Sequence, residues 1–375
     1  MSERIARVAL SRLSEPGDVR LAALVEGLGA NKVFDLLRDE QDVAGVYTDV
    51  ATRLRDLDPE RDLGGAEAKG IRFVCPEDEE WPSALTDLDR AEPLQGRGGV
   101  PLGLWAKGPM RLDEASGRSV ALVGSRSATT YGAGVSSDLA AHVAANGLCV
   151  ISGAAFGIDQ AAHRGALAVK GRTLAVLACG VDRAYPAAHR NLLDYIADTG
   201  LVVSELPPGC SPTRLRFLSR NRVIAALAQG TVVVEAAVRS GALNTANWTT
   251  RMNRVLMGVP GPVTSAPSQG VHELIRTRDA ALVTRGEDVL ELLAPAGVAV
   301  APDRRGADHP RDSLDPRAQQ VLEAVPVASG AGVESIARTS GLGTAEVTTT
   351  LARLKARGFV EESGAEWRVA DLATR

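Results

Sequence analysis

Short apolar runs alternate with helix-length amphipathic stretches along the centre of this chain. The apolar runs lie at 120–123, 149–151, 173–177, 201–203, 231–234 and 255–259. Apolar runs without polar alternation are typical of strands buried on both faces of a parallel sheet. Helical spacing predicts connecting helices at 134–145, 159–169, 189–196 and 219–228. The pattern predicts an α/β fold over residues 70–293, a Rossmann-like, doubly wound and mostly parallel sheet.

The flanking segments follow helical patterns. Residues 1–69 carry apolar positions at helical spacing and predict a small helical domain. The glycine turn around Gly27 and Gly29 resembles helix-hairpin-helix or SAM-like modules, whose backbone N–H groups bind a phosphate. An ordinary helical turn is the favoured interpretation.

The C-terminal part begins with a predicted linker at 294–312, rich in Pro, Gly, Ala and charge. Helical patterns at 315–325, 332–340 and 344–357 precede a strand-turn-strand pattern, so residues 313–375 predict a winged-helix-like domain. Its third helix carries Arg353, Lys355 and Arg357 and could enter a major groove. A protein-contact or dimerisation module is at least as well favoured.

Composition narrows the functional classes. The 375 residues include 42 Lys and Arg against 46 Asp and Glu, a formal net charge of −4, with 45% apolar residues. These values are typical of globular proteins and confine any nucleic-acid site to a local patch. No leader or membrane-spanning apolar stretch is present in the sequence, so we expect a cytoplasmic protein with no membrane contact. The four cysteines lie far apart, which predicts neither a metal site nor disulfides.

Small-residue turns follow several predicted strands and lead into helices, where free N–H groups and close backbone approach favour anion binding. No GxGxxG or Walker sequence is present, which disfavours NAD chemistry and ATP hydrolysis. The residues of these turns that we expect to bind phosphate are Gly124, Ser125, Arg126, Ser152, Gly153, Ser240, Gly241 and Thr245.

An arginine-rich segment, PTRLRFLSRNRVIAAL, surrounds one aromatic residue, Phe217. Guanidinium groups pair with phosphates and aromatic rings stack on bases, so an exposed face of this kind predicts binding of single-stranded nucleic acid. The alternative is a core Phe217 with arginines in ordinary ion pairs. The arginines of the segment are Arg214, Arg216, Arg220 and Arg222.

Two carboxylates, Asp159 and Glu235, stand where acid–base chemistry is conceivable from the sequence. Asp159 and His163 stand one helical turn apart and could form an acid–base pair or half a metal site, but a helix cap and a bond to a neighbouring loop are favoured. Glu235 ends a predicted strand, where a general base or an orienting carboxylate could stand. The orienting role is favoured because no catalytic partner is evident.

These motifs together resemble the DNA processing protein A (DprA/Smf) family. The runs VALVGSRSATTYG, SGAAFGIDQAAHRGAL, TLAVLACGVDRAYPAAHRNL, GLVVSELPPG, FLSRNRVIAAL, VVVEAAVRSGALNTA, VPGPV and SQGVHELI occur in that family's order. The resemblance implies a homodimeric, single-stranded DNA-binding mediator that loads RecA recombinase, without catalytic residues, cofactor or metal. It leaves open natural transformation, plasmid uptake or repair.

Carried over by motif, the resemblance implies that Arg126, Phe217, Arg220 and Arg222 contact DNA, with Arg214 as a further basic contact. Arg190 and Asn221 complete the candidate nucleic-acid-binding residues. The sequence departs from the family pattern at Ala154, Leu218, Asn244 and His272, of which Asn244 and His272 bear on the groove lining. The alternative is a nucleotide-binding enzyme similar to the lysine-decarboxylase-like phosphoribohydrolases, although their PGGxGTxxE motif is absent.

Overall fold

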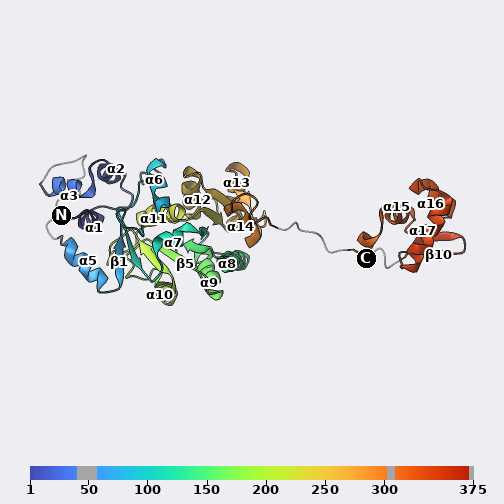
Figure 1. Ribbon diagram of the computed structural model, residues 1–375, viewed down its shortest axis with the longest axis horizontal. Helices are drawn as coiled ribbons and strands as arrows, with labels where there is room; N and C mark the ends of the chain where they lie inside the picture. Colours follow the sequence, from blue (N-terminus) through green and yellow to red (C-terminus); the bar gives the residue numbers. More distant parts are fainter. Residues whose placement is uncertain (40–56, 302–308, 371–375) are drawn as a thin grey trace. The chain divides into compact units, whose positions relative to one another are not determined.

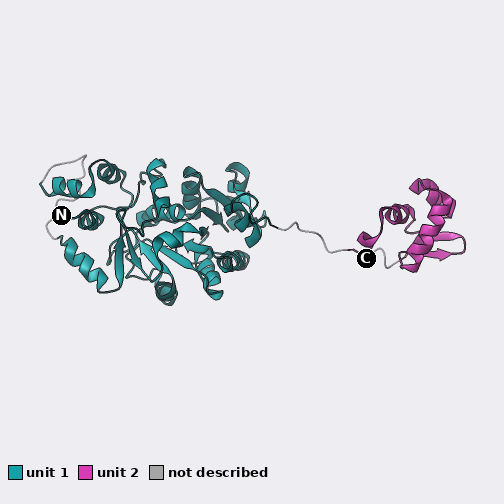
Figure 2. Cartoon of the chain, viewed as in Figure 1, with its two compact units in different colours: residues 1–301 teal, residues 302–375 magenta. Residues whose placement is uncertain are grey.

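A computed structural model describes residues 1–39, 57–301 and 309–370. The chain divides into two compact units, Met1–Ala301 and Pro302–Arg375 (Figure 2). Residues 1–69, predicted as a helical domain, lie in the first unit with the sheet. The predicted linker at 294–312 spans the division, and residues 302–308 of it lie outside the described part.

One sheet organises unit 1, with nine strands in the described residues in the order β1-β2-β6-β5-β4-β3-β7-β8-β9 (Figure 1). The strands from β3 to β9 pair in parallel, whereas β2 runs antiparallel to β6 and β1 antiparallel to β2. The strands are β1 (Ile71–Val74), β2 (Leu104–Lys107), β3 (Ser119–Val123), β4 (Cys149–Ser152), β5 (Thr173–Leu177), β6 (Leu201–Ser204), β7 (Gly230–Val233), β8 (Val255–Gly258) and β9 (Ala281–Leu282).

The predicted α/β class with a mostly parallel sheet is confirmed. All six predicted strands are present within about one residue of their expected bounds, while β1, β2 and β9 had no prediction. Of the missed strands, β1 and β9 form the two edges of the sheet and β2 lies next to β1. The two residues of β9 carry no periodicity, and a charged residue, Arg72 in β1 and Lys107 in β2, shortens the apolar run of each of the other two strands.

Helices cover both faces of the sheet, and alternate side chains of each strand meet a different layer. Val120 and Leu122 of β3 pack with α8 and α9, whereas Ala121 and Val123 pack with α11 and α12. The helices of this unit after β1 are α6 (Asp87–Arg90), α7 (Leu112–Gly117), α8 (Thr130–Ala145), α9 (Ile158–Ala168), α10 (Arg190–Thr199), α11 (Arg214–Leu227), α12 (Ala242–Arg251), α13 (Ala266–Thr277) and α14 (Gly286–Leu293), with 3-10 turns at Ser83–Thr86 and Ala187–His189.

The N-terminal helices attach directly to the sheet. Arg4 donates a hydrogen bond to the Phe73 carbonyl oxygen of β1 at 2.5 Å, and Val8 is buried in the core formed with β1 and α10. The helices are α1 (Glu3–Leu13), α2 (Val19–Leu28), α3 (Ala30–Arg38) and α5 (Pro59–Glu67). The predicted helical pattern beyond Asp39 lies partly outside the described residues.

The phosphate-binding interpretation of the Gly27–Gly29 turn is wrong. Gly29 adopts φ 81° and begins α3, as a glycine turn requires. The Glu3 carboxylate accepts hydrogen bonds from the backbone N–H groups of Ala30 at 2.6 Å and Asn31 at 3.1 Å. A side chain of the same unit therefore occupies the donors that a phosphate would need.

Unit 2 contains three helices and one hairpin in its described residues. They are α15 (Pro316–Ala324), α16 (Val333–Ser340), α17 (Thr344–Ala356), β10 (Val360–Ser363) and β11 (Glu366–Val369), preceded by a 3-10 turn at Pro310–Ser313. The basic side chains of the third helix have partners: Arg353 binds Asp315 and Lys355 binds Glu362. Arg357 donates a hydrogen bond to the Ser313 hydroxyl at 2.7 Å. The two ion pairs reduce the charge that α17 offers to a phosphate.

Candidate nucleic-acid interface

A groove of about 1190 Å³ opens where the central strands of the sheet end. This edge carries the carboxyl ends of the parallel strands, where doubly wound sheets bind ligands. Ten of the fourteen predicted site residues line it: Gly124, Ser125, Arg126, Arg214, Phe217, Arg220, Asn221, Ser240, Gly241 and Thr245. Four do not: Ser152, Gly153, Arg190 and Arg222.

The groove is cationic although the chain is acidic. Its described lining contains two carboxylates, Asp159 and Glu273, and five guanidinium groups, an excess of three positive charges. The arginines are Arg126, Arg214, Arg220, Arg239 and Arg278. Such a concentration raises the local affinity for a polyanion without coating the whole surface with positive charge.

The loop after β3 is held close to β7. Ser125 donates its backbone N–H to the Glu235 carbonyl oxygen at 2.7 Å. A Cβ on Gly124 would lie 2.5 Å from Ile158 Cγ1 and 2.8 Å from that same oxygen, so only glycine fits there. Thr129 caps α8 by accepting from Gly132 N–H. The loop thus presents the exposed Arg126 from a fixed backbone.

Glu235 orients this loop. Its Oε2 accepts from Thr129 N–H at 2.9 Å, and its Oε1 accepts from the Thr129 hydroxyl at 2.5 Å. The side chain is 2% exposed, and a Cβ on Gly132 would lie 2.2 Å from its carboxyl carbon. Both oxygens are therefore occupied, which supports the orienting role over that of a general base.

The Glu235→Ala variant should lose both anchoring bonds of Thr129. Leaving two donors without acceptors costs about 1–3 kcal/mol each when they are buried, so the unfolding free energy and the affinity for single-stranded DNA should both fall. Urea unfolding and fluorescence titration measure the two effects. Glu235→Gln keeps one acceptor oxygen and should lie between the parent and the alanine variant; unchanged affinity in Glu235→Ala would contradict the orienting role.

Phe217 stands at the centre of the cationic part of the groove. The Arg126 guanidinium lies 4.5 Å from its ring centroid and the Arg220 guanidinium 5.7 Å. In the described residues, Arg126 and Arg214 have no carboxylate partner and both are exposed. Helical spacing of three and four residues places Arg214, Phe217 and Asn221 on one face of α11. That face of α11 supplies the groove with one exposed arginine and an aromatic ring together.

Arg220 lies beneath Phe217 rather than on an exposed face. It is 7% exposed and donates to the Val176 carbonyl oxygen at 2.9 Å. Burial lowers the pKa of Arg220 to about 10, with the nearby Asp159 opposing the shift, so the guanidinium stays protonated at neutral pH. A Cβ on Gly153 would lie 1.6 Å from Arg220 Nη1. Gly153 thus makes room for Arg220 instead of meeting a ligand itself.

The prediction that Arg222 belongs to an exposed arginine face is wrong. Residues two apart on a helix point about 200° apart, so Arg222 faces away from Arg220. Its side chain is 0% exposed and binds the Glu205 carboxylate at 2.5 Å. Burial raises the pKa of Glu205, and Arg222 opposes that shift. Arg222 therefore holds the buried side of α11 to Glu205, in the segment that follows β6.

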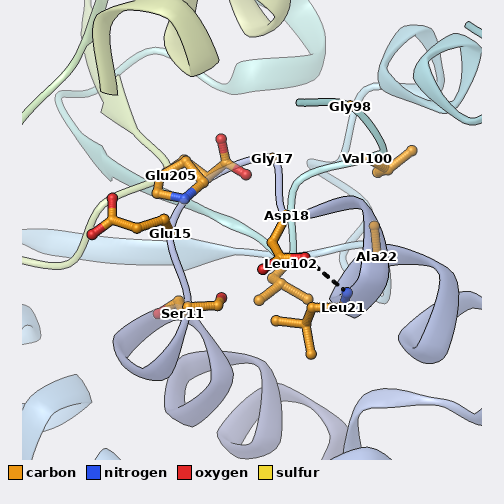
Figure 3. A pocket seen from close by; sticks show the side chains of 12 residues that line it. Ser11, Glu15, Gly17, Asp18, Leu21, Ala22, Gly98, Val100, Leu102 and Glu205 are labelled. Carbon is orange, nitrogen blue, oxygen red and sulfur yellow. Dashed lines mark hydrogen bonds between the residues drawn. The ribbon is translucent and has the colours of Figure 1, made fainter. Parts of the chain in front are cut away.

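The Glu205 side chain borders a small cavity lined by α1, α2 and the segment at residues 98–102 (Figure 3). The cavity measures about 20 Å³, room for about one water molecule. On its rim Glu15 binds Arg216 of α11 through two hydrogen bonds of 2.8 and 2.7 Å. The cavity is too small for a nucleotide, and its contacts join the N-terminal helices to α11.

Two other predicted residues lie outside the groove. Ser152 is buried, and its hydroxyl donates to the Leu122 carbonyl oxygen at 2.6 Å. Arg190 is exposed at the start of α10 but does not reach the groove lining. Asn244 and His272, which depart from the family pattern, lie in different places. Asn244 accepts a hydrogen bond from Asn221 at 3.3 Å inside the groove, whereas His272 contacts Gly261 outside it.

Several lining residues had no prediction. Arg239 and Arg278 extend the positive charge past α12, and Tyr185 contacts Phe217 with ring centroids 5.5 Å apart. Tyr185 belongs to the motif VDRAYPAAHRNL, which gave no chemical signal beyond its place after a strand. These positions are distant in sequence from the arginine-rich segment, so only the fold brings them to it.

Asp159 and His163 each form hydrogen bonds within the fold. Asp159 Oδ2 accepts from the backbone N–H groups of Gly153 at 3.2 Å and Ala155 at 3.4 Å. His163 Nδ1 lies 2.7 Å from Thr173 Oγ1, which donates its own proton to the Val150 carbonyl oxygen, so His163 Nδ1 is the donor. His163 thus bonds to a strand, where a loop was expected. No group of three potential ligands in the described ranges could hold a metal ion.

His163 makes stability depend on pH. Burial lowers its pKa to about 3, whereas the unfolded side chain has a pKa near about 6.5. Between these values the unfolded state binds the extra proton, so the unfolding free energy should fall by up to about 1.4 kcal/mol per pH unit as pH drops below 6.5. Urea unfolding at pH 5 and pH 7 measures this loss. His163→Gln should reduce the loss, and an equal pH dependence in both proteins would contradict the assignment.

The fold and groove define a class of Rossmann-like proteins with a cationic groove at the carboxyl edge of the sheet. A family model described as DNA recombination-mediator protein A matches residues 72–294, and the chain belongs to that family. The resemblance seen in the motifs is thereby confirmed.

The sequence similarity to a known relative extends over nearly the whole chain. A putative DNA processing protein DprA from Mycobacterium tuberculosis H37Rv is 44% identical over 366 residues, covering 96% of this chain and 92% of the relative. The X-ray structure of Streptococcus pneumoniae DprA matches with TM-score 0.62 and 30% identity, covering 77% of this chain and 97% of that one.

A Helicobacter pylori DNA processing protein A, described for its single-stranded DNA binding mode, matches with TM-score 0.51 and 26% identity, covering 59% of this chain and 95% of that one.

Among the described residues, the helices of this chain are too short or too polar to span a membrane.

Proposed function

We propose that this recombination mediator binds single-stranded DNA in the groove defined above and acts without catalytic turnover. The observation that carries the proposal is Phe217 between Arg126 and Arg220 in a groove with an excess of three positive charges. Guanidinium groups bind phosphates, and bases freed from a duplex stack on aromatic rings. The single-stranded DNA binding described for the Helicobacter pylori relative supports this ligand.

The proposed DNA-contacting set is narrower than the sequence predicted. It keeps the ten groove-lining residues, with Arg126 and Arg214 on phosphates and Phe217 on a base. Arg222 leaves the set because it binds Glu205, Ser152 and Gly153 leave it because they are buried, and Arg190 leaves it because it lies outside the groove.

The enzyme alternative is not favoured. A glycosidic-bond hydrolase needs carboxyl groups free to act on the substrate, whereas Thr129 occupies both oxygens of Glu235. Glu235 does not line the groove. Of the two carboxylates that do, Asp159 bonds to the turn at Gly153 and Glu273 pairs with Arg276. This arrangement supports a binding protein that turns over no nucleotide.

The proposal is completed by loading of RecA and by homodimerisation, both of which the resemblance to the family supports. A mediator that holds a single strand while a recombinase polymerises on it needs contact with both. A pull-down of the pure protein with RecA, with and without oligo-dT, tests the first, and sedimentation equilibrium tests the second. Absence of RecA capture under both conditions would exclude direct loading.

Binding itself is tested by titrating fluorescent oligo-dT at several salt concentrations, with duplex DNA of equal length as competitor. The affinity for oligo-dT should fall steeply with salt, because released counterions drive the binding, with a slope of about 0.7 per neutralised phosphate. Duplex DNA should compete poorly, since its paired bases cannot reach Phe217. Equal competition by the duplex would contradict the proposed ligand.

A further inference from the structure

Tyr185 is an exposed aromatic side chain on the wall of the groove. It is 42% exposed and lines the groove together with Arg126 and Phe217. Its ring centroid lies 5.5 Å from that of Phe217, with the planes tilted by 51°. Its hydroxyl has no hydrogen-bond partner in the part of the chain that the structure describes. A large apolar ring is thus left open to solvent inside a cationic groove.

The neighbours of Phe217 cover part of its ring, whereas the Tyr185 ring is more open to solvent. The Arg126 guanidinium lies 4.5 Å from the Phe217 centroid, within cation–π distance, and Tyr185 contacts the same ring. Phe217 is half-buried by these neighbours. Of the two rings, Tyr185 therefore offers the more exposed surface to an incoming base.

Three other exposed aromatic residues of unit 1 differ from Tyr185 in their position. Tyr131, Phe156 and Tyr195 are similarly exposed, at 47%, 46% and 51%, but none lines the groove. Phe156 packs edge-on against His189, and the Tyr131 hydroxyl donates to the Pro260 carbonyl oxygen at 2.6 Å. Among these four, only Tyr185 lines the groove that carries the five arginines.

Resting on the proposed function, we propose that Tyr185 is a second base-stacking residue, which binds the nucleobase next to the one at Phe217. The tilt between the two rings favours two successive bases, one on each ring, over a single base held between them. The phosphates flanking these bases lie within the reach of Arg126 and Arg214, which are exposed beside the two rings. The site takes a single strand of at least two nucleotides with unpaired bases.

The test compares oligo-dT with an oligonucleotide of equal length that carries abasic sites throughout. Stacking is worth about 1–3 kcal/mol per base, so Tyr185→Ala should weaken oligo-dT binding by about 5-fold or more. Its affinity for the abasic strand should not change, because that strand offers only phosphates. Tyr185→Phe keeps the ring and should bind oligo-dT like the parent. Tyr195→Ala, which removes an exposed ring outside the groove, is the matched control.

A second comparison separates direct stacking from support of Phe217. In a Phe217→Ala background, Tyr185→Ala should cause a further loss of oligo-dT affinity; no further loss would mean that Tyr185 acts only through Phe217 and would overturn the proposal. An equal loss on oligo-dT and abasic DNA would also overturn it. If the parent protein fails to bind oligo-dT, the proposed function itself fails, a result distinct from either of these.

Discussion

Replacing Arg126 by Ala should reduce the affinity for single-stranded DNA by about 10-fold to 150-fold, since a hydrogen bond to a charged group is worth about 1.5–3 kcal/mol. Arg126 is exposed, has no carboxylate partner in the described residues, and stands on a loop fixed by Glu235. Its removal should also lower the salt dependence by about 0.7 in log–log slope, the contribution of one phosphate. Fluorescence titration across salt concentrations gives both quantities.

Arg190→Ala is the matched control for this experiment. Arg190 is also an exposed arginine of unit 1, but it lies outside the groove. The Arg190→Ala change removes the same charge from the protein but leaves the groove intact. The affinity for single-stranded DNA and the slope of its salt dependence should therefore stay nearly unchanged. Equal losses in the two variants would show that net charge, and not the groove, governs binding.

Replacing Arg222 by Ala should destabilise unit 1 by about 3–5 kcal/mol, because the change leaves the Glu205 carboxylate buried without its partner. The side chain of Arg222 is 0% exposed and that of Glu205 is 12% exposed. Urea unfolding followed by tryptophan fluorescence measures this loss. At low temperature, where the variant stays folded, its affinity for oligo-dT should match that of the parent.

A double variant, Arg222→Met with Glu205→Leu, tests the cause of this destabilisation. Replacing both members of a buried ion pair by apolar residues of similar size is often neutral or stabilising. The double variant should therefore be much more stable than Arg222→Ala. A large loss of DNA affinity in a folded Arg222 variant would restore Arg222 as a DNA contact and contradict the position found for it.

The sequence predicted the central sheet because strands buried on both faces leave continuous apolar runs. It also predicted the groove, since the turn at Gly124 and the segment around Phe217 carry their chemistry locally. Arg222 was misplaced because four arginines in nine residues were taken as one exposed face. Applying the helical repeat of about 100° per residue would have separated Arg220 from Arg222.

Other features depend on contacts distant in sequence. Tyr185 reaches Phe217, and Glu3 occupies the start of α3, only after the fold forms. No local pattern marks either contact. The net charge of −4 is likewise uninformative by itself, since five arginines still gather in the groove.

The most direct test of a single-stranded DNA groove is cross-link mapping with oligo-dT that carries photoreactive thymine analogues, analysed by mass spectrometry of the full chain. We expect cross-links to peptides containing Arg126, Tyr185 and Phe217, and we expect unlabelled oligo-dT to abolish them by competition. Cross-links confined to peptides of residues 309–370, or resistant to that competition, would contradict it.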